Sequence, residues 1–420
     1  MPHLPAACPP NLWTDRDFVK LWIGHTASQF GAQTAQFTLP LVALIALGGG
    51  AAELGGLRAA QQVPILLCSL FVGVLVDRLS TRTLMVYADL ARALALAAVP
   101  VAFLLDALGL PLLSLIAFLV GVFTVFFDVA YQACLPRLVQ RGQLAQGNSL
   151  LESSRSATQI CGPALGGGLV ALLTAPLALA AGAVFFILSF ASIRRIRRPD
   201  PPAEYESHSA GMLPEIKAGL RLVLHDRALR AIGLASATHH FFFAALMTTY
   251  LVFLTTVLRL PSGVLGLVLA ALGPGALLGA VFSAKLPRLV GYGPVMVVAA
   301  LAADLVLLCV PALRGAGAAT VVVLMVVNVA FGALSQLVDV SATAVRQAVV
   351  PIRSQGRVVA TLNFVGMGLT PLGSVLAGVL AGPLGIRTVL LLSVSGMFLS
   401  PLCLALSPLR RLGRTLPGET

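Results

Sequence analysis

The chain alternates between long apolar runs and short polar turns. Crossing the hydrocarbon core of a bilayer takes about 20 apolar residues as a helix, and a backbone inside lipid must satisfy its own hydrogen bonds. Each long apolar run is therefore predicted to be a membrane-spanning helix, which makes the chain an all-α membrane protein with twelve transmembrane helices. The runs cover residues 21–47, 55–76, 83–105, 111–135, 148–174, 176–193, 229–257, 262–284, 293–313, 317–340, 357–382 and 386–407.

The composition points to the same surroundings. Only 10% of the 420 residues are charged and 58% are hydrophobic, whereas a soluble domain carries about 25% charged residues. So few charges cannot cover so much apolar surface in water, and a lipid bilayer is the expected solvent. The six cysteines stand far apart without metal-ligand spacing. We therefore expect neither a metal site nor a cofactor.

The basic residues are distributed unequally between alternate turns. With the N-terminus inside, 22 arginines and lysines fall in inner turns and tails, and four fall in outer turns, at Arg58, Arg259, Arg314 and Arg387. Cytoplasmic loops carry such an excess, so we expect both termini in the cytoplasm. These loops account for the net charge of +12, and no nucleic-acid partner is expected. Only three of the 28 basic residues are lysines, and this preference for arginine indicates a GC-rich bacterial genome and hence a bacterial inner membrane.

The longest polar stretch, residues 194–228, divides the chain into two halves of six predicted spans. Three prolines interrupt regular structure there, and residues 212–224 have the pattern of an amphipathic interfacial helix. We expect an N-terminal six-helix bundle over 1–193, a cytoplasmic linker over 194–228 and a C-terminal six-helix bundle over 229–420.

A charged turn recurs once in each half. Residues 73–82 read Gly-Val-Leu-Val-Asp-Arg-Leu-Ser-Thr-Arg, and residues 279–288 read Gly-Ala-Val-Phe-Ser-Ala-Lys-Leu-Pro-Arg. Some transporters are built from parallel repeats of this kind. The two bundles are therefore predicted to be pseudo-symmetric.

The first of these turns resembles a motif of the major facilitator superfamily, Gly-x-Leu-x-Asp-Arg-x-x-x-Arg between spans two and three. The matching residues are Gly73, Leu75, Asp77, Arg78 and Arg82. The chain is similar to that superfamily over essentially its whole length. Residues 132–148 and 356–358 resemble the branch that contains macrolide efflux proteins and the enterobactin exporter. The resemblance implies the major facilitator fold, a monomer and transport by alternating access.

The resemblance also implies that the turn is a gating latch on the cytoplasmic side. Asp77 would face the start of span eleven, where the positive end of the helix dipole favours a carboxylate. Arg82 would bridge to Asp128 near the inner end of span four. In the alternative interpretation, the charged turn with Arg78 only anchors the hairpin. Ser283 replaces the acid in the second half, so a weaker latch is expected there.

Span five contains a second family-like pattern. Gly162, Pro163, Gly166 and Gly167 resemble the Gly-Pro-x-x-Gly-Gly core of the superfamily's antiporter motif, with Thr158 in place of its leading glycine. Residues without bulk allow helices to approach closely. The resemblance implies a seal between the halves that prevents leak during antiport. Ordinary small-residue packing is the alternative.

Span one carries a polar stripe, in which His25, Gln29, Gln33 and Gln36 fall on one helical face. Glutamine side chains are costly in lipid, so the stripe is predicted to face protein or a water-filled cavity. The family topology implies a place beside the central cavity, where these residues would contact the substrate. Hydrogen bonding between helices is the alternative.

Span seven is the repeat counterpart of span one. His240, Phe243 and Met247 share one of its faces. Aromatic and methionine side chains form an adaptable apolar wall that suits varied ligands. The same residues equally fit ordinary helix packing.

Two pairs of ionisable residues within spans have helical spacing. Asp89 and Arg92 are three residues apart in span three, and Glu152 and Arg155 repeat that spacing in span five. We expect structural ion pairs at both places rather than proton carriers.

Asp304 lies in the middle of span nine without an opposite charge within one helical turn. An ionisable residue inside a membrane span is a functional candidate. It is interpreted as a proton carrier or as a neutral acid hydrogen-bonded within the bundle. Proton coupling itself is implied by the resemblance, with Asp304, His25 and His240 as its candidate residues.

The predicted function is export of a small amphipathic or hydrophobic molecule, such as a drug, an antibiotic or a siderophore-like metabolite, by proton antiport. Its expected partners are the substrate, protons and the lipid bilayer. One alternative is a lipid or metabolite permease or uniporter of the same fold, and another is a non-transporting membrane sensor or assembly partner. The sequence has no nucleotide-binding loop, metal cluster or nucleophile elbow, so enzyme activity is not expected.

Overall fold

The computed structural model describes residues 12–139, 143–198, 220–283, 285–349 and 355–414. Nearly all of these residues are helical, and no strand occurs among them. The first helix group consists of α1 (Arg16–Leu41), α2 (Ala51–Arg78), α3 (Thr81–Leu104), α4 (Leu110–Leu138), α5 (Leu144–Leu172) and α6 (Ala175–Arg194), with the short turns η1 (Leu12–Thr14) and η2 (Val42–Ala46).

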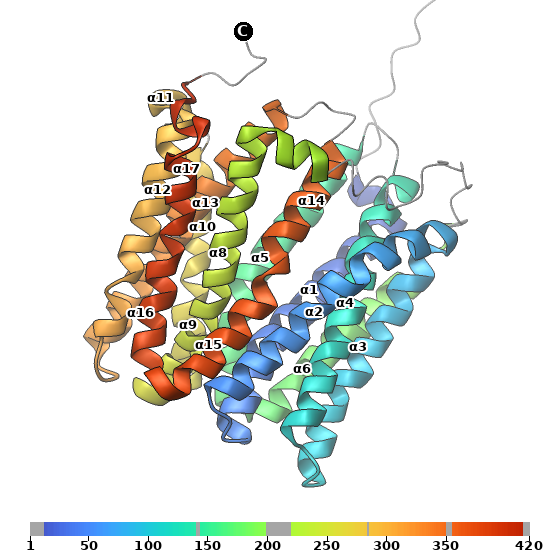
Figure 1. Ribbon diagram of the computed structural model, residues 1–420. Coiled ribbons are helices and arrows are strands. Elements are labelled where there is room, and N and C mark those ends of the chain that lie inside the picture. Colours follow the sequence, from blue (N-terminus) through green and yellow to red (C-terminus); the bar gives the residue numbers. More distant parts are fainter. Residues whose placement is uncertain (1–11, 140–142, 199–219, 284, 350–354, 415–420) are drawn as a thin grey trace, which may run out of the picture.

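The second helix group is more often interrupted along the chain (Figure 1). Its elements are α8 (Arg227–Val252), η4 (Phe253–Val257), α9 (Ser262–Ala270), α10 (Leu272–Ser283), α11 (Leu286–Val290), α12 (Tyr292–Leu307), η5 (Val310–Ala312), α13 (Ala318–Val349), α14 (Gln355–Gly368), α15 (Thr370–Leu384), α16 (Ile386–Met397), α17 (Leu399–Ala405) and η7 (Pro408–Arg411).

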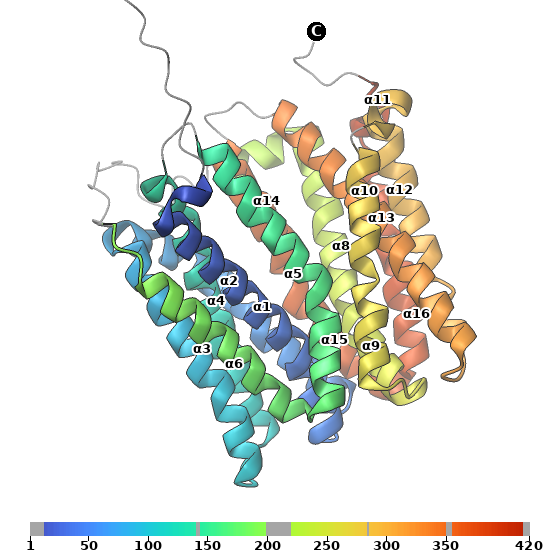
Figure 2. The same ribbon diagram turned by 180° about the vertical axis from the view of Figure 1, so that it is seen from behind.

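Nine helices of the described residues are long and apolar enough to cross a membrane, so the chain is a multi-pass membrane protein. Three further long helices, α1, α2 and α5, lie alongside them in the same bundle (Figures 1 and 2). They coincide with the predicted spans 21–47, 55–76 and 148–174. The total of twelve spans stays a prediction.

Carboxylate caps begin the first helix of each group. Asp15 accepts hydrogen bonds from the backbone N–H groups of Asp17 and Phe18 at the start of α1. Asp226 accepts in the same way from Ala228 and Leu229 at the start of α8. Such caps satisfy N–H groups that have no partner within the helix and fix where the helix begins.

The predicted linker is described only in part, because residues 199–219 lie outside the described residues. Residues 220–225 are helical, and Val223 packs into the second helix group. Leu220 and Leu224, which the amphipathic pattern places on the same side as Val223, are exposed. The linker and the division into 1–193, 194–228 and 229–420 stay predictions.

The two ends of the molecule differ in how the helix groups pack. We call the end where α1 begins and α6 finishes the basic end, which lies at the top of Figure 1. At the opposite end, one continuous apolar core contains buried side chains of both groups, including Phe37, Leu54, Tyr250, Leu265 and Phe331.

At the basic end, each group has an apolar core of its own. Phe18, Met85 and Ile193 belong to the core of the first group, and Leu229 and Met296 belong to the core of the second. The described residues of the two groups are thus joined by a shared core at the opposite end and keep separate cores at the basic end.

Glycines allow the backbones of the two groups to meet at the opposite end. A Cβ atom on Gly167 of α5 would lie 2.7 Å from the Cα atom of Gly266 in α9. A Cβ atom on Gly55 of α2 would lie 2.5 Å from the carbonyl oxygen of Ser374 and 3.2 Å from the Cα atom of Gly378, both in α15. Only glycine fits such close crossings without displacement of a helix.

Replacement of Gly167 by valine is expected to destabilise the protein, because the side chain would force α5 and α9 apart. Overpacking of this kind costs about 1–3 kcal/mol. The apparent melting temperature of the purified protein in detergent measures the effect. Gly168→Val is the matched control, because nothing lies within 4 Å of a Cβ atom at Gly168. Equal melting temperatures of the two variants would contradict the close α5–α9 crossing.

Candidate functional site

A buried ion pair joins Asp89 and Arg92, one turn apart in α3. Their side chains are 0% and 1% exposed. Ser189 of α6 donates a hydrogen bond of 2.5 Å to one carboxylate oxygen of Asp89, and Ser28 of α1 donates one of 3.2 Å to the other. Both oxygens of the carboxylate are thereby satisfied.

The guanidinium of Arg92 lies between two aromatic rings. Its Cζ atom is 4.3 Å from the ring centre of Phe186 in α6 and 4.6 Å from that of Phe127 in α4. It also donates a hydrogen bond of 2.8 Å to the hydroxyl of Ser28. Cation–π contacts of this kind are strongest where the cation is desolvated. The pair therefore connects α1, α3, α4 and α6, and the structure brings Asp89 and Arg92 together as the spacing predicts.

The pair with the same spacing in α5 has different surroundings. Glu152 and Arg155 approach to 3.8 Å with side chains that are 63% and 45% exposed. Exposed pairs contribute little to stability. The structure therefore places one of the two predicted pairs in the interior and the other in contact with solvent.

The polar stripe of α1 does not act as one surface. His25 is completely buried, with its ring 4.4 Å from that of Tyr131 and 6.2 Å from that of Phe127. Neither ring nitrogen has a hydrogen-bond partner among the described residues. Aromatic side chains of α4 enclose His25 in this structure, and its place beside a substrate cavity stays a prediction.

The three glutamines of the stripe lie in different environments. Gln29 is buried and hydrogen-bonded to the Asp128 carboxylate in α4. A Cβ atom on Gly162 of α5 would lie 2.5 Å from the Cβ atom of Gln33, so Gln33 packs on α5. Gln36 is exposed. Of the four predicted contacts, Gln33 and Gln36 are still available to a ligand.

The predicted gating residues are described only in part. Gly73, Asp77 and Arg78 belong to α2, but the structure does not describe the surroundings of Gly73 or the side chains of Asp77 and Arg78. Arg82 donates a hydrogen bond of 2.8 Å to the backbone carbonyl of Arg194 at the end of α6. Asp128 is hydrogen-bonded to Gln29 and lies within electrostatic reach of Arg92 and Arg155. The pairing of Arg82 with Asp128 stays a prediction.

The antiporter-like glycines are contact points on two sides of α5. Gly162 and Gly166 face α1, where a Cβ atom on Gly166 would lie 2.8 Å from the Phe37 ring. Gly167 faces Gly266 of α9, and a Cβ atom on Gly266 would lie 2.6 Å from the Pro163 carbonyl oxygen. The motif therefore permits close packing within the first group and between the groups.

A polar cavity of about 330 Å³ lies inside the second helix group, between α8, α12, α13 and α17. Asp304 lines it from α12 and is 2% exposed. Its Oδ2 atom has no hydrogen-bond partner among the described residues. The other polar side chains of the lining are Ser236, His239, His240, Ser335, Asp339, Thr343, Arg346 and Ser400.

The aromatic face of α8 leads from this cavity to the shared core. The Nδ1 atom of His240 lies 2.8 Å from the Ser236 carbonyl oxygen, so Nδ1 carries a proton and Nε2 is the acceptor when the ring is neutral. The ring of His239 stacks on Phe243, and Phe243 stacks on Phe331 of α13. His240 thus lines the cavity, whereas Phe243 and Met247 pack against the apolar core at the opposite end.

Ser28, Ser189 and the cavity around Asp304 were not predicted from the sequence. The two serines stand in apolar runs of different helices, and only their common contact with Asp89 reveals a role. The cavity combines side chains of four helices that are distant in sequence. No group of histidine, cysteine and acidic side chains in the described part of the chain is suited to hold a metal ion.

Comparisons with known proteins agree along almost the whole chain. The family described as transmembrane secretion effector matches residues 12–415. The multidrug efflux pump Tap of Mycolicibacterium fortuitum is 28% identical over 375 residues, which cover 87% of this chain and 89% of that protein. The multidrug efflux pump Tap of Mycobacterium tuberculosis (strain ATCC 25618 / H37Rv) is 26% identical over 353 residues, 82% of each chain.

Solved structures of low sequence identity share the fold. A bacterial homologue of the iron transporter ferroportin, in an inward-facing state, superposes with a TM-score of 0.74 at 16% identity, over 93% of this chain and 98% of that one. The nucleoside transporter NupG superposes with a TM-score of 0.70 at 11% identity, over 93% and 98% of the two chains.

The substitution Asp89→Asn is expected to destabilise the protein, because it leaves the charge of Arg92 buried without its counter-ion. Loss of one partner from a buried pair costs about 3–5 kcal/mol. Glu152→Gln is the matched control, since it breaks an exposed pair with the same spacing and should cost less than about 1 kcal/mol. Thermal unfolding of both variants in detergent measures the difference. A similar loss in both would show that the Asp89–Arg92 pair is not the stronger constraint.

Proposed function

Because the chain belongs to the transmembrane secretion effector family of the major facilitator superfamily, we propose that it exports a small amphipathic or hydrophobic molecule by proton antiport. Transport by alternating access is supported above all by the division of the apolar cores. The groups share a core at the opposite end and have separate cores at the basic end. Rocking of one group against the other would exchange these two arrangements.

The direction of transport is supported by the relatives. Multidrug efflux pumps of two mycobacterial species are similar to this chain over more than four fifths of its length. The excess of basic residues in alternate turns favours a cytoplasmic basic end. With that orientation the separate cores of the described residues would lie on the cytoplasmic side, from which an exporter takes up its substrate.

We further propose that the chain comprises two six-helix halves, 1–193 and 229–420, joined by the cytoplasmic linker 194–228. The two groups of helices in Figure 2 and the carboxylate caps at α1 and α8 support this division. The glycine crossings of α2 with α15 and of α5 with α9 would then be equivalent contacts between the halves.

Asp304 is the residue that best fits the proton carrier. Burial of an unpaired charge is costly, so a carboxyl with a free oxygen in a polar cavity favours a bound proton or a cationic partner. His240, another candidate for proton coupling, lines the same cavity. His25 is less suited, because aromatic rings enclose it.

The substrate class is inferred from the scarcity of fixed charge. Gln33 and Gln36 of α1 are polar and uncharged, and the aromatic ladder of His239, Phe243 and Phe331 provides apolar surface. Ligand sites usually combine such apolar walls with a few polar groups. A lipid or metabolite uniporter is the second candidate, since the same walls would suit a lipid and no proton would then be required.

The proposal predicts that expression of the protein raises the resistance of an efflux-deficient bacterium to amphipathic antibiotics and to ethidium. In energised inverted membrane vesicles, ethidium should release part of the proton gradient. Asp304→Asn should lower this release at least tenfold, because the proton-binding group is removed. Asp106→Asn is the control, since Asp106 is exposed and its left-handed backbone (φ 53°) suits asparagine as well as aspartate.

Loss of the proton response in wild-type vesicles that still accumulate ethidium would favour the uniporter. Full proton release by the Asp304→Asn variant would exclude Asp304 as the carrier.

The latch proposed for the turn 73–82 predicts a difference between the halves. Asp77→Asn should abolish resistance while the protein stays in the membrane, because the latch would lose the carboxylate expected to face span eleven. Ser283→Ala changes the equivalent position of the second half, where the Ser283 hydroxyl donates to the Ala280 carbonyl of its own helix. We expect this variant to stay active. Equal resistance of the two variants, at equal membrane levels, would argue that the turn only anchors the hairpin.

A further inference from the structure

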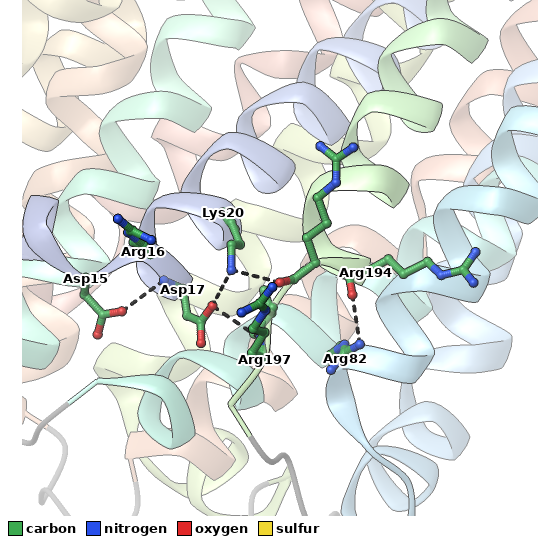
Figure 3. A pocket seen from close by; sticks show the side chains of 9 residues that line it. Asp15, Arg16, Asp17, Lys20, Arg82, Arg194 and Arg197 are labelled. Carbon is green, nitrogen blue, oxygen red and sulfur yellow. Dashed lines mark hydrogen bonds and ion pairs between the residues drawn. The ribbon is translucent and has the colours of Figure 1, made fainter.

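A basic hollow lies on the outside of the first helix group at the basic end. It has a volume of about 800 Å³ and is formed where α1 and α3 begin and α6 ends (Figure 3). Six cationic side chains and two carboxylates line it: Arg16, Lys20, Arg82, Arg194, Arg195, Arg197, Asp15 and Asp17.

Both carboxylates of the hollow are bound within the protein. Asp17 accepts a hydrogen bond of 2.7 Å from Lys20 and further ones from the backbone N–H groups of Arg197 and Arg198. Partial burial raises the pKa of Asp17, which precedes the first span, but these hydrogen bonds lower it more, so its pKa lies below the ordinary value. Asp15 caps α1 and pairs with Arg198 at 2.9 Å. Neither acid is free to neutralise Arg194, Arg195 or Arg197.

Three arginines at the end of α6 are exposed in the hollow, Arg194, Arg195 and Arg197. Their guanidinium groups donate no hydrogen bond to any described residue. The backbone carbonyls of Arg194 and Arg195 instead accept from Arg82 and Lys20 (Figure 3), which fixes the end of α6 and directs the arginine side chains outward. The fork of an arginine donor group matches phosphate oxygens.

A second hollow continues the first along the outer surface of α3 and α6. It has a volume of about 550 Å³ and shares Arg82, Arg194 and Arg197 with the basic hollow. Val86, Tyr87, Leu90 and Phe190 form an apolar groove in its remaining lining, which also contains Ser80, Thr83 and Arg198.

The apolar groove leads onto a surface of the kind that faces lipid. Tyr87, Leu94 and Ile187 of α3 and α6 are 66%, 64% and 50% exposed. These two helices are long and apolar enough to span a membrane. A cationic pocket therefore adjoins an apolar groove on the outside of two membrane helices.

We propose that this double hollow binds an anionic phospholipid, with the phosphate at Arg82, Arg194 and Arg197 and an acyl chain against Tyr87, Leu90 and Phe190. A free phosphate or a soluble nucleotide would use the arginines but not the apolar groove. Basic residues beside a membrane span attract anionic lipids. The site is separate from the cavity around Asp304 and does not depend on the proposed transport.

Lipid binding to the purified full-length protein, stripped of lipid in detergent, tests the proposal by native mass spectrometry. Phosphatidylglycerol is compared with phosphatidylcholine of the same acyl chains, and inorganic phosphate in excess is the competitor. Phosphatidylglycerol should bind at least tenfold more tightly, and inorganic phosphate should not displace it.

The double variant Arg194→Gln with Arg197→Gln should weaken phosphatidylglycerol binding about 25-fold, since each basic residue near an anionic surface contributes about fivefold. The control removes the same charge from exposed arginines of the second group at the same end, by Arg288→Gln with Arg410→Gln, and should change binding less than threefold. Displacement by inorganic phosphate would show that the site binds a free anion rather than a phospholipid, and it would overturn the proposal. Equal binding of the two lipids, or equal effects of the two double variants, would overturn the site.

Discussion

The buried ion pair of Asp89 and Arg92 is the interaction on which the first helix group depends. Ser28 of α1, Phe127 of α4, and Ser189 and Phe186 of α6 all contact it from outside α3. Charges are stable in a protein interior only when they are paired and hydrogen-bonded, so rotation of any of these helices would expose an uncompensated charge. The pair therefore holds α1, α3, α4 and α6 of the first group together. The described part of the second group has no such pair, and its buried acid, Asp304, faces a cavity with one oxygen unbound.

This difference suits the two groups to distinct tasks in the proposed transport. A first group fixed by its own polar interior is suited to move as a unit, whereas a second group with a polar cavity is suited to bind a proton or a ligand. The groups touch where glycines remove side-chain bulk, at Gly167 with Gly266 and at Gly55 with Gly378. Backbone contacts without interlocking side chains hold two surfaces together and still allow them to tilt. The shared core beside these crossings and the separate cores at the basic end fit a tilt about the opposite end.

Periodicity and hydrophobicity predict most of the fold. The run 83–105 corresponds to α3, and the spacing of Asp89 and Arg92 places them on one face of it. The predicted span 317–340 ends earlier than the helix, because α13 continues to Val349 and some of its polar residues there line the cavity around Asp304. The sequence does not show whether a polar helix face lines a cavity or packs on protein, because that depends on the neighbouring helices. His25 has the spacing of a cavity residue, but Phe127 and Tyr131 of α4 enclose it. Arg82 donates to the backbone carbonyl of Arg194 at the end of α6, a contact that the sequence alone does not reveal.

Distances between spin labels on the two helix groups test the tilting of the groups most directly. Cysteines for labelling replace exposed residues, Thr83 with Arg288 at the basic end and Asp106 with Gly317 at the opposite end, in an otherwise cysteine-free protein. Pulsed electron paramagnetic resonance in lipid nanodiscs is measured at neutral and acidic pH, with and without ethidium. We predict that binding of the proton or the ligand shifts the equilibrium between the two arrangements of the helix groups. The distance at the basic end then shortens, and the distance at the opposite end lengthens. Two distances that stay constant under all conditions, or that change in the same direction, would contradict alternating access by these two groups.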